Sequence, residues 1–137
     1  MMRTGAAVLV LGCALSACGG SFKAPDLFLV QRSGSVPGAS LALVVNEEGG
    51  VSCNRGATLK LSDPQLIQAR ALQEELQSPA SRNLSLPAAP GSVLQYRVRD
   101  ENGSVRFADN SRGQPAVLRK LALFTLQVAQ SVCHLPM

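Results

Sequence analysis

The chain has 137 residues and a formal net charge of +4 at pH 7, and 46% of its residues are hydrophobic. Its basic residues are mostly arginine and are scattered along the chain, which argues against a nucleic-acid-binding protein. The length is sufficient for one domain with a single hydrophobic core.

The N-terminus has the pattern of a secretory signal peptide. Arg3 supplies a short positive segment, and the apolar run from Gly5 to Ala14 is too short to span a bilayer as a stable anchor. We therefore predict that residues 1–17 are a signal peptide, which is removed and takes no part in the fold.

The end of this signal peptide, Leu15-Ser16-Ala17-Cys18, resembles the lipobox of bacterial lipoproteins. The resemblance implies that Cys18 becomes the first mature residue and carries acyl chains, which partition into a bilayer. The mature protein is then expected on the outer face of the cell membrane, or in the outer membrane if the cell has one. An ordinary signal peptide cut near Ala17 is the alternative. Residues 18–25 would form a lipidated tether, and residues 26–134 a single domain.

The first part of this domain predicts three strands. Leu27–Arg32 is a short apolar run of β-forming residues, and Ala39–Val45 alternates loosely between apolar and small or polar residues. A turn over residues 46–50 leads into a third short strand, Val51–Asn54.

The segment between the first two strands, Ser33–Gly38, is rich in glycine and serine. Such a loop after a strand can bind phosphate, but phosphate loops lead into a helix, whose backbone amides point at the anion. Here the loop leads into a strand pattern. We therefore predict a hairpin connection in which Gly34, Pro37 and Gly38 supply the turn.

A first helix is predicted to begin at Ser62 or Asp63, because either side chain can cap free backbone amides and Pro64 suits the first turn. The helix is expected to end near Ser78-Pro79, and residues 79–91, which contain prolines, are expected to form an extended connector. The apolar residues at helical spacing are Leu66, Ile67, Ala69, Leu72 and Leu76.

A second hairpin is predicted from Leu94–Arg99 and Val105–Ala108, joined by a turn over Asp100–Gly103. The strict alternation of the first strand indicates a half-buried antiparallel strand, and Asn102-Gly103 suits positive φ. The predicted core face holds Tyr96, Val98, Val105 and Phe107, and the predicted solvent face holds Gln95, Arg97, Arg99 and Arg106.

The last helix is predicted from Pro115 to about Val132 and is apolar enough to be buried against the sheet. Arg119 and Lys120 lie within it, so we do not expect a membrane span. The order β-β-β-α-β-β-α predicts an α+β fold, with two helices packed on one face of an antiparallel sheet of about five strands. The apolar stripe of this helix comprises Val117, Leu121, Phe124, Val128 and Val132, widened by Leu118, Ala122, Leu123 and Leu126.

Two cysteines, Cys53 and Cys133, remain after Cys13 leaves with the signal peptide and Cys18 is lipidated. Two cysteines in an exported protein most often form one disulfide, and closing a loop of about 80 residues stabilises a fold by up to roughly 4 kcal/mol. A metal or thiol site that includes His134 is the alternative. It is disfavoured because adjacent side chains rarely converge on one ion, and a tetrahedral site needs four ligands.

Few residues of the sequence suit catalysis. The single histidine, His134, lies near the end of the chain, and a nucleophile would have no other imidazole as its base. The carboxylate pairs Glu47-Glu48, Glu74-Glu75 and Asp100-Glu101 fall in predicted turns or on a solvated helix face. We therefore predict that the protein is not an enzyme and uses no cofactor or metal.

The order of several short motifs resembles the emfourin-like family over residues 26–130. Phe28–Gly34, with its loop closing on Gly38, resembles the family's opening strand and Arg-Ser-Gly-Gly turn, although Ser35 replaces the second glycine. The named member of that family inhibits thermolysin-like metallopeptidases, so the resemblance implies an extracellular protein partner of this kind. The later motifs that follow in the same order are Leu61–Pro64 with its helix, Tyr96–Asp100 with Asn102-Gly103, and Pro115–Leu121.

The sequence therefore predicts a lipid-anchored, protein-binding module on the cell surface. Its most specific form is an emfourin-like inhibitor of a thermolysin-like metallopeptidase, and no nucleic-acid partner is expected. The alternative is a structural or envelope-interaction lipoprotein without inhibitory activity, whose outward-facing hairpin arginines would contact anionic wall polymer. The candidate partner contacts are the loop residues Arg32, Ser33, Gly34, Ser35, Val36 and Pro37.

Overall fold

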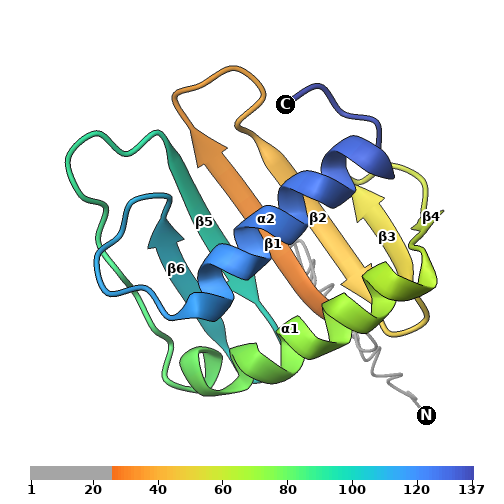
Figure 1. The fold of residues 1–137 in the computed structure, drawn as a ribbon, viewed down its shortest axis with the longest axis horizontal. Helices are drawn as coiled ribbons and strands as arrows, with labels where there is room; N and C mark the ends of the chain where they lie inside the picture. The colour runs from red at the N-terminus through yellow and green to blue at the C-terminus, as the bar shows by residue number, and fades with distance from the viewer. Residues whose placement is uncertain (1–25) are drawn as a thin grey trace, which may run out of the picture.

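The computed structural model describes residues 26–137 and has an open six-stranded sheet with both helices on one face (Figure 1). The predicted signal peptide, lipobox and tether lie outside the described residues. The α+β class and the antiparallel sheet are as predicted. The elements are β1 (Asp26–Gly34), β2 (Leu41–Asn46), β3 (Gly50–Cys53), β4 (Leu59–Lys60), α1 (Asp63–Ser81), β5 (Leu94–Arg99), β6 (Ser104–Ala108) and α2 (Ala116–Ser131).

The sheet is built outward from β1. The strands lie in the order β4-β3-β2-β1-β5-β6, so β1 pairs with β2 on one side and with β5 on the other, antiparallel in both cases. The sixth strand, β4, was not predicted from the sequence. It has only two residues, Leu59 and Lys60, which pair with Val51 and Gly50 at the edge of the sheet, and two residues carry no periodicity.

Alternation along the strands places one set of apolar side chains under the helices. Phe28 and Val30 of β1 are fully buried, and Phe28 contacts Phe124 of α2 edge to face, with the ring centroids 6.1 Å apart. This geometry is favourable for an aromatic pair. The predicted core face of the second hairpin is confirmed, because Tyr96, Val98, Val105 and Phe107 are all buried.

The first helix begins with the predicted cap and ends later than predicted. The Gln65 amide donates to Ser62 Oγ, and the Ser62 amide donates to Gln65 Oε1, which together form a capping box. The helix continues through the buried Pro79 to Ser81. A proline lacks one N–H donor, and in the last turn this removes a single backbone hydrogen bond, while the proline ring is buried.

The second helix is buried along most of the predicted stripe, but the prediction for Leu123 was wrong. Leu123 is 54% exposed, whereas Leu121, Phe124 and Val128 are buried. Leu123 lies on the side of α2 that faces away from the sheet, because it is two residues beyond Leu121 and adjacent to Phe124. No helix within residues 26–137 combines the length and apolar character needed to cross a membrane.

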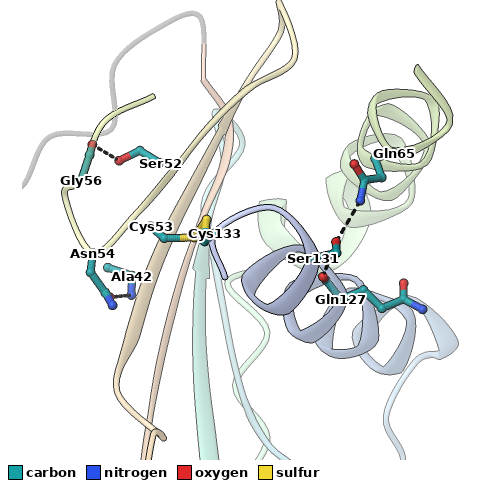
Figure 2. Close-up of a disulfide and its surroundings, with 9 residues drawn as sticks. All are labelled: Ala42, Ser52, Cys53, Asn54, Gly56, Gln65, Gln127, Ser131 and Cys133. Carbon is teal, nitrogen blue, oxygen red and sulfur yellow. Dashed lines mark hydrogen bonds between the residues drawn. A yellow bond between two sulfur atoms is a disulfide. The ribbon is translucent and has the colours of Figure 1, made fainter. Parts of the chain in front are cut away.

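The predicted disulfide is present and joins the two layers of the fold. Cys53 at the end of β3 and Cys133, just after α2, have their sulfur atoms 2.06 Å apart. Figure 2 shows this bond between the sheet and the turn after α2. Beside it, Gln65 of α1 donates a hydrogen bond to Ser131 Oγ of α2. The disulfide therefore fastens the end of α2 to the β3 side of the sheet.

We predict that reducing this disulfide lowers the free energy of unfolding by up to roughly 4 kcal/mol, because the open chain regains the entropy of a long loop. Urea unfolding of the oxidised and reduced chain, followed by circular dichroism, measures the difference. A Cys53→Ser/Cys133→Ser variant should match the reduced chain and should not respond to reductant. Equal stability of the oxidised and reduced chains would contradict this role.

Candidate functional site

The first of the predicted contact residues, Arg32, points into the protein. Its side chain is buried, with only 6% of the residue exposed. Arg32 Nε donates to the Ala39 carbonyl at 2.9 Å, and Nη2 donates to the Gly38 carbonyl at 2.9 Å. Nη2 also donates to Met137 Sδ at 2.6 Å. Arg32 therefore holds the β1–β2 loop closed and fixes the end of the chain against it, as the proximity of the loop and the C-terminus in Figure 1 illustrates.

The remaining predicted contact residues lie at the surface at one end of the sheet. Ser33 and Gly34 were predicted to lie in the loop, but β1 extends through both of them and pairs them with Gln95 and Leu94, so Gly34 does not supply the turn. Gly34 is required by a close approach of two backbones, since a Cβ atom there would collide with the Val93 carbonyl oxygen. The neighbouring Ser35 amide donates to that same carbonyl at 3.1 Å. The loop is thus a hairpin connection, as predicted, and it is braced against the residue that precedes β5. The exposed side chains in this region are those of Ser33 in β1 and of Ser35, Val36 and Pro37 in the loop.

Tyr96 lies beside Arg32 on the helix side of the sheet. The two residues are direct partners in the β1–β5 register, and the Tyr96 ring stacks on Phe107 with 4.8 Å between the ring centroids. Burial raises the pKa of the Tyr96 phenol above its ordinary value of 10.0, although the Arg32 charge and hydrogen bond act in the opposite direction. The neutral phenol is therefore the form that the fold accommodates.

The opposite face of the sheet, which we call the outer face, is not covered by either helix (Figure 1). The predicted solvent face of the second hairpin forms one half of it, and all four of those side chains are exposed. Gln31 and Ser33 of β1 are also exposed and lie next to this hairpin. The exposed outer-face residues of β1, β5 and β6 are Gln31, Ser33, Gln95, Arg97, Arg99 and Arg106.

Two arginines of the outer face stand directly opposite each other. Arg97 of β5 and Arg106 of β6 are partners in the strand register, and we call them the arginine pair. Residues in such positions have Cβ atoms about 5 Å apart, and like charges there destabilise a sheet. Within the described residues, neither side chain of the pair forms an ion pair or a hydrogen bond, since the one salt bridge joins Lys120 to Glu75. The pair is therefore an uncompensated concentration of positive charge.

A hollow of about 500 Å³ adjoins the arginine pair. Its wall is the connector, which the sequence predicted to be extended and which in fact runs alongside β6. The Arg106 amide donates to the Leu84 carbonyl, and the Leu86 amide donates to the Arg106 carbonyl, at 2.9 and 2.8 Å. The lining of the hollow includes Gln31, Ser33, Ser85, Pro87, Gln95 and both members of the arginine pair.

Side chains that follow β6 hold this connector in place. Ser111 Oγ donates to the Pro87 carbonyl at 2.9 Å, and Asn110 Oδ1 accepts from the Ala89 amide at 3.0 Å. Asp109 accepts from the Ser92 hydroxyl at 2.7 Å. Slight burial acts to raise the pKa of the Asp109 carboxyl, but this hydrogen bond and those from backbone amides outweigh it and lower the pKa. The wall of the hollow is thus fixed by several polar contacts.

The described residues form an exposed, positively charged surface and no metal cluster. Residues 26–137 contain no group of three or more His, Cys, Asp or Glu side chains that could hold a metal ion. The predicted alternative of a thiol site at Cys133 and His134 is wrong, because the Cys133 sulfur is bonded to Cys53. The chemistry that the outer face provides is hydrogen-bond donation and positive charge from Arg97, Arg106 and the neighbouring amides.

The sequence assigned the outward arginines to one face but did not identify the arginine pair or the hollow. The alternation of apolar and polar residues in the hairpin showed on which face of the sheet each side chain lies. It did not show which residue of β5 stands opposite which residue of β6. Gln31 and the connector line the hollow because β1 is the neighbour of β5 and the connector is the neighbour of β6, and the sequence did not reveal this order. Comparisons of the chain with protein-family models, curated proteins and solved structures gave no match, so the emfourin-like resemblance stays a prediction.

We predict that stability falls more steeply above pH 10 in the natural chain than in a Tyr96→Phe variant. The raised pKa means that the folded state keeps its phenol proton where the unfolded state loses it, so this contribution is present below pH 10 and lost as the pH rises through the folded pKa. Urea unfolding at a series of alkaline pH values measures both slopes. Tyr96 is the only tyrosine, so phenolate absorbance reports its ionisation directly. If the free energy of unfolding falls equally steeply with pH in both chains, the raised pKa of Tyr96 is contradicted.

Proposed function

We propose that the protein is a protein-binding module that contacts its partner through the outer face of the sheet. The observation that carries this proposal is the arginine pair, Arg97 and Arg106, which is exposed and has no carboxylate partner among residues 26–137. Two like charges directly opposite each other destabilise a sheet, and no packing contact or salt bridge within the described part of the domain offsets this cost. A partner surface of complementary charge would compensate them.

The proposal includes attachment of the module to the outer surface of a membrane through lipid on Cys18. It is supported by the apolar run that precedes Leu15-Ser16-Ala17-Cys18 and by the resemblance of these four residues to a lipobox. A disulfide such as Cys53–Cys133 suits an exported protein. Residues 18–25 would then separate the lipid from β1, which begins at Asp26.

The most specific form of the proposal is inhibition of a thermolysin-like metallopeptidase. It is supported by the order of the motifs that resemble the emfourin-like family, from Phe28–Gly34 to Pro115–Leu121. The enzyme would contact two neighbouring parts of the surface, which are the arginine pair on the outer face and the exposed residues from Ser33 to Pro37 at its end.

The experiment uses the mature chain purified from membranes in detergent, with its intact mass establishing whether Cys18 is acylated. The chain is added to a panel of thermolysin-like metallopeptidases, and cleavage of a peptide substrate is followed. We expect slower cleavage by at least one enzyme, and weaker inhibition by an Arg97→Gln/Arg106→Gln variant than by an Arg119→Gln variant, which removes an exposed charge from α2.

Unchanged cleavage by every enzyme of the panel would exclude the inhibitory form. An unmodified Cys18 would exclude the lipid anchor. Equal inhibition by the double variant and the natural chain would show that the enzyme does not use the arginine pair.

A further inference from the structure

We infer that the arginine pair is an anion-binding site and that its occupant is a carboxylate-bearing segment of a protein partner. The inference rests on the proposed function and adds the chemistry of the partner. In this site one aspartate or glutamate side chain of the partner lies between Arg97 and Arg106, and the rest of the segment follows the outer face.

The geometry of the two guanidinium groups suits one shared carboxylate. Strand pairing fixes the backbones of Arg97 and Arg106 side by side, and both side chains leave the sheet on the same side. A guanidinium presents its N–H donors as a planar fork that matches the two oxygens of a carboxylate. One carboxylate can therefore accept from both residues, and its charge relieves the repulsion between them.

Acidic residues are absent from the strands around the site. The acidic residues Asp100 and Glu101, which line a hollow with Arg97, lie in the turn after β5, where Asp100 accepts hydrogen bonds from the Asn102 and Gly103 amides and Glu101 accepts one from Gln73. Strands β2 to β6 contain no aspartate or glutamate. On the outer face the nearest neighbours of Arg97 are Gln31 across the sheet and Gln95 and Arg99 along β5, and none of these side chains is negatively charged. The surroundings therefore favour an anion supplied from outside the sheet.

The distribution of charge on the sheet favours a protein segment over an anionic polymer as the occupant. The exposed positive charge of the sheet is concentrated in β5 and β6, where Arg99 accompanies the pair, and the only other exposed basic strand residue among residues 26–137 is Lys60 of β4 at the opposite edge. The adjoining parts of β1 and β2 place Leu29, Ala42 and Val44 on the outer face, each of them half-buried. A polymer with an anion in every repeat needs a continuous positive track. A charged zone beside an apolar one matches a protein surface, in which a few charges accompany apolar contacts.

The experiment is a selection of peptides on the full chain. A phage-displayed library of random dodecapeptides is panned against the immobilised protein, and the enriched peptides are synthesised and their affinities measured by fluorescence anisotropy. We expect enrichment of peptides that combine an aspartate or glutamate with apolar residues. We also expect their affinity to fall by about 10- to 100-fold in an Arg97→Gln/Arg106→Gln variant and to remain unchanged in an Arg119→Gln variant.

A folding control accompanies the binding data. Because removing like charges relieves repulsion, the double variant should unfold at the same temperature as the natural chain or at a higher one. Lost binding in a variant of undiminished stability would thus be caused by the missing guanidinium groups. Binding of the acidic peptides should also weaken as the salt concentration rises.

Several results would overturn the inference. These are a selection that enriches no peptide, enriched peptides without carboxylate side chains, and acidic peptides that bind the double variant as well as the natural chain. Inorganic polyphosphate that binds through the arginine pair more tightly than any selected peptide would identify a polymer as the occupant. Peptides without carboxylates that still bind the outer face would leave the proposed function intact while excluding its acidic partner.

Discussion

The structure depends on the packing of the helices against β1 at the centre of the sheet. Phe28 and Val30 are fully buried beneath the helices, and Phe28 contacts Phe124 of α2. Because successive side chains of a strand point to opposite faces, burying this set commits the remaining side chains of β1 and its neighbours to the outer face. The position of the arginine pair therefore follows from the packing of the core. Because Val98 and Val105 pack inward, the adjacent residues Arg97 and Arg106 point outward.

Two contacts near the C-terminal end of α2 hold the helix layer against the sheet. The Cys53–Cys133 disulfide joins β3 to the segment that follows the helix, and Arg32 joins the β1–β2 loop to Met137 in the same segment. Buried charge is costly unless its donors find partners, and the carbonyls of Gly38 and Ala39 supply them for Arg32. The predicted contact loop is thus anchored from inside the protein, and its exposed residues form an end of the outer face.

The fold could be predicted from the sequence largely because the spacing of apolar residues in each segment indicates whether it forms a strand or a helix and which of its faces is buried. The alternation around Tyr96 and the capping box at Ser62 depend on neighbouring residues only. The arginine pair depends on register, which alternation does not determine. A two-residue turn at Asn102-Gly103 would have placed Arg99 opposite Arg106, whereas the observed turn closes between Asp100 and Gly103 and places Arg97 there. Both registers put the same residues outside. The burial of Arg32 likewise depends on residues that are distant in the sequence.

The central claim is that partners bind the outer face of the sheet and not the helices. The most direct measurement places a photo-cross-linking amino acid at Gln95 on the outer face, or at Gln68 on the exposed side of α1, in the full chain expressed in its own cells. The account predicts protein adducts from position 95 that disappear with the Arg97→Gln/Arg106→Gln substitutions, and none from position 68. Adducts from position 68 alone would contradict it.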